Sequence, residues 1–162
     1  MAQNDERTAR PSVIDRLIDH DPRLAGDPGI SLNESIRRYK DSVLRDLEWL
    51  LNTRRTVIEV PDECGELTRS TFTFGLPDIS SISGDSDVNR RQLLRDVEEC
   101  IRTFEPRLTG VHVSPVEEME GAHRRVRFVI EGLLRMEPNP ERVLFDTVLD
   151  LSSGRIQVAG GG

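Results

Sequence analysis

The stretch RVRFVIEGLLRMEPNPERVLFDTVLDLSSGRIQV, residues 125–158, decides the fold. Apolar and polar residues alternate along 125–136 and again along 142–151, which is the period of a strand with one buried face. A shorter run of the same kind occupies 110–116. A Pro-rich turn separates the two long runs, and such turns favour antiparallel neighbours. The sequence therefore predicts an antiparallel sheet in the C-terminal half.

The last strand of this sheet is predicted from a hairpin signal. Ser152-Ser153-Gly154 lies between the run 142–151 and the apolar-containing segment 155–158. Gly154 can adopt the positive φ that tight hairpin turns require. We therefore expect 155–158 to pair with the preceding strand, and residues 159–162 to form a flexible Gly-rich tail.

Helical periodicity dominates the N-terminal half. Apolar residues recur at helical spacing along 32–52, and Ser31 with Glu34 has the pattern of a capping box. A second amphipathic run over 87–104 should end before Pro106, because the residue preceding a proline is pushed out of the helical region. A short amphipathic helix is also expected within 12–18.

The order of these elements gives the fold class. Helices precede strands, which predicts an α+β fold with N-terminal helices packed on one face of a small, mainly antiparallel C-terminal sheet. The expected domain organisation is a disordered tail over 1–11, a single domain over 12–158 and the Gly-rich end. Within the loop between the long helices, 56–60 could form a short extended segment. Phe72 and Phe74 are expected to pin the rest of this loop to the core.

Composition restricts the kinds of partner. The chain has 162 residues, a formal net charge of −7 and 4% aromatic residues. An acidic protein is poorly suited to nucleic acid or to an anionic membrane surface. No apolar run approaches the length of a membrane span, and the polar N-terminus is not a secretory signal. We expect a cytoplasmic protein without direct membrane insertion.

Catalytic and metal-binding patterns are weak. The three histidines lack partners at triad or metal-ligand spacing, and Cys64 and Cys100 form no CxxC motif. Two carboxylates could serve a glycosidase, but a sugar cleft usually has aromatic platforms. The single tryptophan, Trp49, is better explained by core packing. The prediction is a protein without enzyme activity, catalytic residues, cofactor or metal.

Glu105-Pro106-Arg107 is the most informative triplet. Proline fixes the direction of the chain at the helix end, so that the two charged side chains project in defined directions. One interpretation is a helix stop with a local ion pair, which contributes at most ~1 kcal/mol when exposed. The other is a rigid docking point for the charged groups of a partner. Spacing alone favours the local pair.

The last strand also allows two interpretations. It could simply complete the sheet, or it could be an edge that pairs with a strand of another chain. Native edges are normally protected, and Arg155 and Gln157 would protect this one only lightly. The candidate edge comprises Arg155, Ile156, Gln157 and Val158.

Four motifs together resemble a known family. They are DLEWLLNTR at 46–54, FGLPD at 74–78, FEPRL at 104–108 and the terminal hairpin. In this order, over about residues 12–158, they resemble the TssE family of type VI secretion baseplate subunits. These are relatives of the phage-tail baseplate wedge proteins that are often labelled lysozyme-like.

The resemblance implies partners for both ambiguous features. It implies a baseplate position beside TssF and TssG and near TssK, on the cytoplasmic side of the inner membrane. Glu105, Pro106 and Arg107 would dock on the helical core bundle of the wedge. The terminal strands would template polymerisation of the TssB/TssC sheath. The lysozyme-like label implies no activity, because a fold does not fix a function.

Three other functions stay open as hypotheses. A regulatory adaptor or anti-adaptor of the same fold family would use the domain as a binding module. A prophage or bacteriocin tail baseplate would use it much as a secretion system does. A peptidoglycan hydrolase is the enzymatic alternative, and we expect no such activity.

Overall fold

The computed structural model describes residues 12–18, 32–79, 87–116, 125–137 and 139–161. In chain order the elements are α1 (Val13–Leu17), α2 (Leu32–Asn52), the 3-10 helices η1 (Asp62–Arg69) and η2 (Thr71–Thr73), α3 (Asp87–Phe104), β1 (Leu108–Pro115), β2 (Arg125–Leu134), β3 (Glu141–Asp150) and β4 (Arg155–Gly161).

The helices precede a four-stranded antiparallel sheet, which confirms the predicted α+β class. The strand order is β1-β2-β3-β4, so each strand pairs with its sequence neighbours and β1 and β4 lie at the two edges. Antiparallel neighbours need only short connections, and the Asp150–Arg155 hairpin closes through Gly154 at φ +67°.

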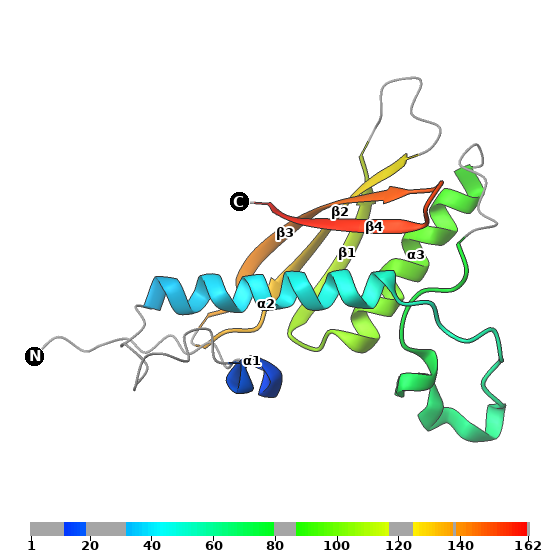
Figure 1. Ribbon diagram of the computed structural model, residues 1–162, viewed down its shortest axis with the longest axis horizontal. Helices are drawn as coiled ribbons and strands as arrows, with labels where there is room; N and C mark the ends of the chain where they lie inside the picture. The colour runs from blue at the N-terminus through cyan, green and yellow to red at the C-terminus, as the bar shows by residue number, and fades with distance from the viewer. Residues whose placement is uncertain (1–11, 19–31, 80–86, 117–124, 138, 162) are drawn as a thin grey trace, which may run out of the picture.

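One face of the sheet forms the core with the two long helices. Alternate residues of β2 and β3 point inward and are buried, among them Phe128, Ile130, Phe145 and Leu149. Figure 1 shows α2 running along β4, while α3 lies on the β1 side, and α3 packs against β1 as α2 packs against β4. Each helix therefore covers one half of the sheet and reaches one of its edges.

The predicted long helices and strands match the observed ones, with small shifts at their ends. Helix α2 covers Leu32–Asn52 and α3 covers Asp87–Phe104. The predicted capping box falls on Ser31, outside the described residues. A capping box is found at α1 instead, where the Ser12 hydroxyl accepts from the Asp15 amide and the Asp15 carboxylate accepts from the Ser12 amide.

The C-terminal segment differs from the prediction of a tail beginning at residue 159. Strand β4 extends through Gly161, and Ala159, Gly160 and Gly161 pair with Asp146, Phe145 and Leu144. Glycines have low strand propensity, but β3 supplies a partner over this whole length. Pairing with β3 therefore overrides the local preference.

Two predictions about apolar residues were wrong. Residues 56–60 form no strand, and the side chain of Val57 is 88% exposed. Trp49 is 56% exposed and lies outside the core, with the Arg45 guanidinium 5.2 Å from its ring centroid. At about 100° per residue, Trp49 lies roughly 200° around the helix from the buried Leu47 and Leu51.

A parallel bridge between Arg54 and Leu76 fastens the loop after α2. The Arg55 amide donates to Leu76 O at 2.9 Å, and the Leu76 amide donates to Thr53 O at 2.9 Å. Gly75 adopts φ +102°, and a Cβ there would lie 2.4 Å from Thr53 O. Phe74 packs against the core as predicted, whereas Phe72 does not belong to the core cluster.

The bridge predicts a specific requirement for glycine at position 75. Gly75→Ala should lower the free energy of unfolding by about 2 kcal/mol or more, because alanine is strained at this φ and its Cβ meets backbone. Urea denaturation measures the change. Gly65→Ala is the control, since nothing lies within 4 Å of a Cβ at that position. Equal effects of the two substitutions would contradict the prediction.

Candidate functional site

The Glu105-Pro106-Arg107 triplet lies where α3 ends and β1 begins. The Glu105 amide still donates to Ile101 O at 2.9 Å, and the Leu108 amide donates to Glu105 O at 3.1 Å as the chain turns into the sheet. Glu105 is buried, with 4% of its surface exposed, whereas Pro106 is exposed. The two charged side chains therefore point into the protein, and the proline points out of it.

Arg107 binds Glu105 through one edge of its guanidinium, formed by Nε and Nη2. Its Nε donates to Oε1 at 2.7 Å, and its Nη2 donates to Oε2. The Arg107 amide adds a third contact, 3.2 Å from Oε1. A planar guanidinium fits a carboxylate in this bidentate geometry, which a lysine could not reproduce. The local pair is thus present, but it is buried and not an exposed surface pair.

Helix α2 supplies the remaining partners of Arg107. Nη2 also donates to Asp46 Oδ2 at 2.7 Å, and Nη1 donates to the Ser42 hydroxyl at 3.3 Å. The Ser42 hydroxyl in turn donates to Tyr39 O at 2.8 Å. The triplet is therefore fixed to the middle of α2, more than 60 residues earlier in the chain.

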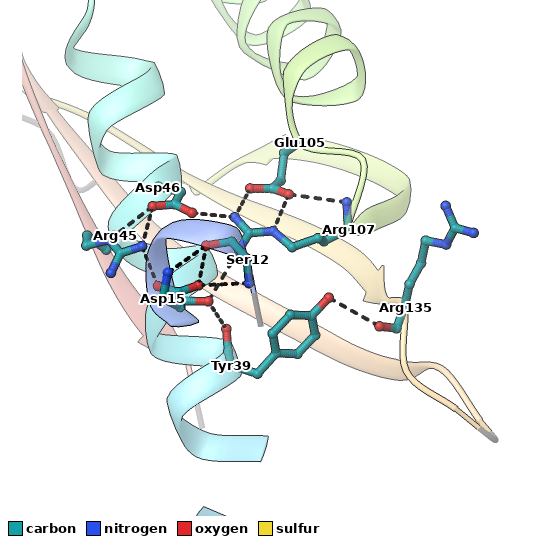
Figure 2. A network of polar contacts seen from close by, with 9 residues as sticks. Ser12, Asp15, Tyr39, Arg45, Asp46, Glu105, Arg107 and Arg135 are labelled. Atoms are coloured by element: carbon teal, nitrogen blue, oxygen red, sulfur yellow. Dashed lines mark hydrogen bonds and ion pairs between the residues drawn. The ribbon is translucent and has the colours of Figure 1, made fainter. Parts of the chain in front are cut away.

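The charge network continues from Asp46 to α1. Arg45 donates to Asp46 Oδ1 through Nε at 3.0 Å and through Nη2 at 2.8 Å. The same Nη2 lies 2.8 Å from Asp15 Oδ1 on α1. Figure 2 shows Asp46 between the two guanidinium groups, with Asp15 beyond Arg45. Opposite charges alternate along the series Asp15, Arg45, Asp46, Arg107 and Glu105, which we call the charge network.

The pKa values of Arg107 and Asp15 follow from these contacts. Burial opposes the charged form of Arg107, but hydrogen bonds and attraction from Glu105 and Asp46 raise its pKa above the usual value. Burial likewise opposes ionisation of Asp15, yet hydrogen bonds from Ser12 and Arg45 lower its pKa below the usual value. Both groups are therefore charged at neutral pH, and each holds its partners in place.

Sequence reasoning found two of the five members of the charge network. Arg45 and Asp46 lie on the first long helix, and only 30% and 25% of their side chains are exposed. Asp15 was not singled out at all. Their spacing in the sequence contains no signal for this contact, because the three segments meet only in the folded chain.

The outer backbone of β4 is partly closed by α2. The Asn52 side chain donates to Ile156 O at 2.8 Å and accepts from the Ile156 amide at 2.9 Å. Both polar groups of Ile156 therefore point away from β3. Since orientation alternates along a strand, the amides and carbonyls of Val158 and Gly160 also point outward. The side chains of Ile156 and Val158 are buried, while those of Arg155 and Gln157 are exposed.

The opposite edge of the sheet is closed by α3. Arg102 donates to Val111 O at 2.9 Å, and the Val113 amide donates to Glu98 Oε2 at 2.9 Å. Arg102 and Glu98 also form an ion pair at 2.8 Å. Two consecutive outward residues of β1 are thus occupied, whereas on β4 only Ile156 has such a partner among the described residues. The part of β4 from Val158 to Gly160 is the more open edge.

Among the described residues, no group of three or more His, Cys, Asp or Glu side chains could hold a metal ion. No helix in the same part of the chain is long and apolar enough to cross a membrane.

The fold and site define a small α+β domain that presents a fixed helix exit and a partly open strand edge. The family model for the baseplate wedge protein gp25 matches residues 37–139, more than half of the sequence, and this chain belongs to that family. The family is one of structural phage-tail proteins, which confirms the predicted resemblance. The match includes Arg45, Asp46, Glu105 and Arg107 but ends before β3. A search of curated proteins found no match.

The buried Glu105–Arg107 pair predicts that Arg107 contributes to the stability of the folded chain. Arg107→Ala should lower the free energy of unfolding by about 3–5 kcal/mol, because it leaves the buried Glu105 carboxylate without its main partner. Urea denaturation at neutral pH measures this loss. Arg37→Ala is the control, since its ion pair with Glu34 involves an arginine side chain that is 71% exposed, and it should change stability little. A small effect at Arg107 would contradict the buried-pair interpretation.

Proposed function

We propose that this chain is a structural baseplate subunit of a type VI secretion system. It would dock on the TssF/TssG wedge near TssK, on the cytoplasmic side of the inner membrane, and template the TssB/TssC sheath through its C-terminal strands. Membership of the baseplate wedge family supports the structural role. The observation that carries the proposal is the partly open edge of β4, because β3 and β4 form the end of a sheet that an incoming strand could extend.

The proposed role requires no catalysis, cofactor or metal. Each of the two guanidinium groups in the charge network lies between two carboxylates, with hydrogen bonds of 2.7 Å from Arg107 to Asp46, 2.8 Å from Arg45 to Asp15 and 2.7 Å from Arg107 to Glu105. Such an arrangement serves rigidity, since the three inner groups Arg45, Asp46 and Arg107 are each held by two neighbours. We therefore propose a non-enzymatic subunit whose partners recognise surfaces.

In wedge docking, the three residues of the triplet Glu105-Pro106-Arg107 would have different roles. The Glu105 and Arg107 side chains are engaged within the chain, and they fix the backbone on both sides of Pro106. Pro106 is exposed at this rigid turn. The turn would therefore enter the TssF/TssG bundle through Pro106, while the buried pair keeps its shape. This preorganisation reduces the entropy lost on binding.

Wedge docking can be tested without disturbing the buried pair. Pro106→Arg should abolish co-purification with TssF and TssG, because it adds a long charged side chain at the centre of the proposed contact. Gln92→Arg is the matched control: it adds the same charge at an exposed position in the first half of α3, and it should co-purify normally. Circular dichroism should show both variants folded. Normal co-purification of Pro106→Arg would rule out docking at this turn.

A test of the proposed strand edge requires a substitution that leaves the hydrophobic core intact. Ile156 is unsuitable, because its side chain is fully buried and its amide binds Asn52. Gly160→Pro removes an outward amide and places a ring on the edge. It should block TssB/TssC sheath formation, seen by electron microscopy, while TssF/TssG binding persists.

Gly160→Ala is the control for the strand edge. It keeps the amide, and its Cβ would lie 3.4 Å from Leu44 Cδ1, the end of a flexible side chain. It should therefore allow sheath formation. Normal sheaths with Gly160→Pro would show that β4 is not the template.

A phage or bacteriocin tail baseplate is the second candidate, because the matching family is that of a phage-type baseplate wedge protein. Genes for TssF, TssG and TssK beside this gene would favour the secretion system. Genes for phage tail proteins would favour the tail.

A further inference from the structure

A separate pocket lies between the chain leaving α2 and the short helix η2. Its volume is about 420 Å³, and its accessible wall is mainly apolar. The lining residues are Thr53, Arg54, Arg55, Thr56, Thr71, Phe72 and Phe74. The pocket belongs neither to the charge network nor to the edge of β4. We call it the Phe72 pocket.

The walls of the Phe72 pocket are held from two sides. The Arg54–Leu76 bridge fixes the chain after α2 against the segment after η2. Phe74 packs edge-on against Phe104 with ring centroids 5.3 Å apart. Phe72 is half-buried but lies outside the core cluster, so part of its ring remains available. A pocket with fixed walls loses little entropy when it binds a ligand.

Two arginines are among the residues that line the pocket. The Arg54 guanidinium donates to Leu51 O at 3.2 Å and to Gly154 O, which are both neutral acceptors. Arg55 has an exposed side chain, while its backbone amide is used in the bridge. Within the described part of the chain, neither arginine forms an ion pair with a carboxylate. Two arginines without a carboxylate partner among the described residues therefore belong to the lining of a mainly apolar pocket, in a protein of net charge −7.

Two exposed apolar residues follow the pocket lining in the sequence. Val57 and Ile58 follow the lining residue Thr56 and are 88% and 66% exposed. An isolated small molecule would fill the pocket alone, whereas a peptide could also contact these two side chains. These two exposed apolar side chains beside the lining segment favour a peptide as the ligand.

We propose that the Phe72 pocket binds an acidic peptide segment of a partner protein. An aromatic or long aliphatic side chain of the peptide would lie against Phe72 and Phe74, and neighbouring carboxylates would pair with Arg54 and Arg55. Arginine suits this role because its planar guanidinium binds carboxylates in two-point contacts. The proposal concerns a different surface from the wedge and sheath contacts, so it can fail or succeed independently of them.

Titrations followed by NMR of the ¹⁵N-labelled full chain test the proposal. The first probe is a capped tetrapeptide of alternating aspartate and phenylalanine. We expect saturable shifts of the Thr53, Thr56 and Phe72 amides, with a dissociation constant of about 1 mM or below. The same peptide with asparagine in place of aspartate should bind roughly fivefold more weakly, because it lacks the charges that face the arginines.

A third probe, 3-phenylpropionate, separates a peptide site from a site for a small aromatic acid. It carries the ring and one carboxylate but cannot reach Val57 and Ile58, so it should bind more weakly than the peptide. Tighter binding of this compound would overturn the peptide assignment. Equal binding of the aspartate and asparagine peptides, or no saturable shift with either, would overturn the proposal.

Substitutions of residues that line the Phe72 pocket test whether the peptide binds there. Phe72→Ala and Arg55→Gln should each weaken binding of the aspartate peptide by at least about threefold. Arg95→Gln is the matched control, since it removes an exposed arginine from α3 and should leave binding unchanged. The Phe72→Ala variant should keep the melting temperature near that of the unmodified chain, because Phe72 is not in the core cluster. Unchanged binding in both pocket variants would place the peptide elsewhere.

Discussion

The buried guanidinium of Arg107 fixes the relative positions of three segments of the chain. A charge removed from water requires partners with good geometry, and Arg107 finds them in Glu105 at the exit of α3 and in Asp46 on α2. Through Arg45 the same network reaches Asp15 on α1. Because Arg107 also binds Asp46 and Ser42 on α2, the exit of α3 cannot shift relative to α2 without breaking these contacts. The rigid turn at Pro106 is a consequence of this arrangement.

The positions of the two long helices also decide which parts of the sheet remain open. Helix α3 places Glu98 and Arg102 against β1, and α2 ends with Asn52 against Ile156 of β4. These side chains bind backbone groups that would otherwise form a free edge. Beyond Ile156 the outward groups of β4 have no such side chain among the described residues. One edge is therefore more open than the other, which suits the proposed template role.

The triplet illustrates how a motif can act indirectly. The sequence suggested that Glu105 and Arg107 either pair locally or meet a partner's charges. In the structure they pair within the chain, and only Pro106 of the three is exposed. Under the proposed function, the charged residues shape the contact and the proline makes it. Docking by this turn stays a prediction, whereas the internal pair is a property of the fold.

Periodicity in the sequence was sufficient for the elements and the fold class. The stripes of α2 and α3 and the alternation of β2 and β3 are local patterns, and burial of one face follows from them. Trp49 could have been placed on the exposed side of α2 from its helical angle. The contacts of Arg107 with Asp46 and of Asn52 with Ile156 join residues 61 and 104 positions apart. Such contacts depend on how the helices pack on the sheet, and therefore only the tertiary structure decided them.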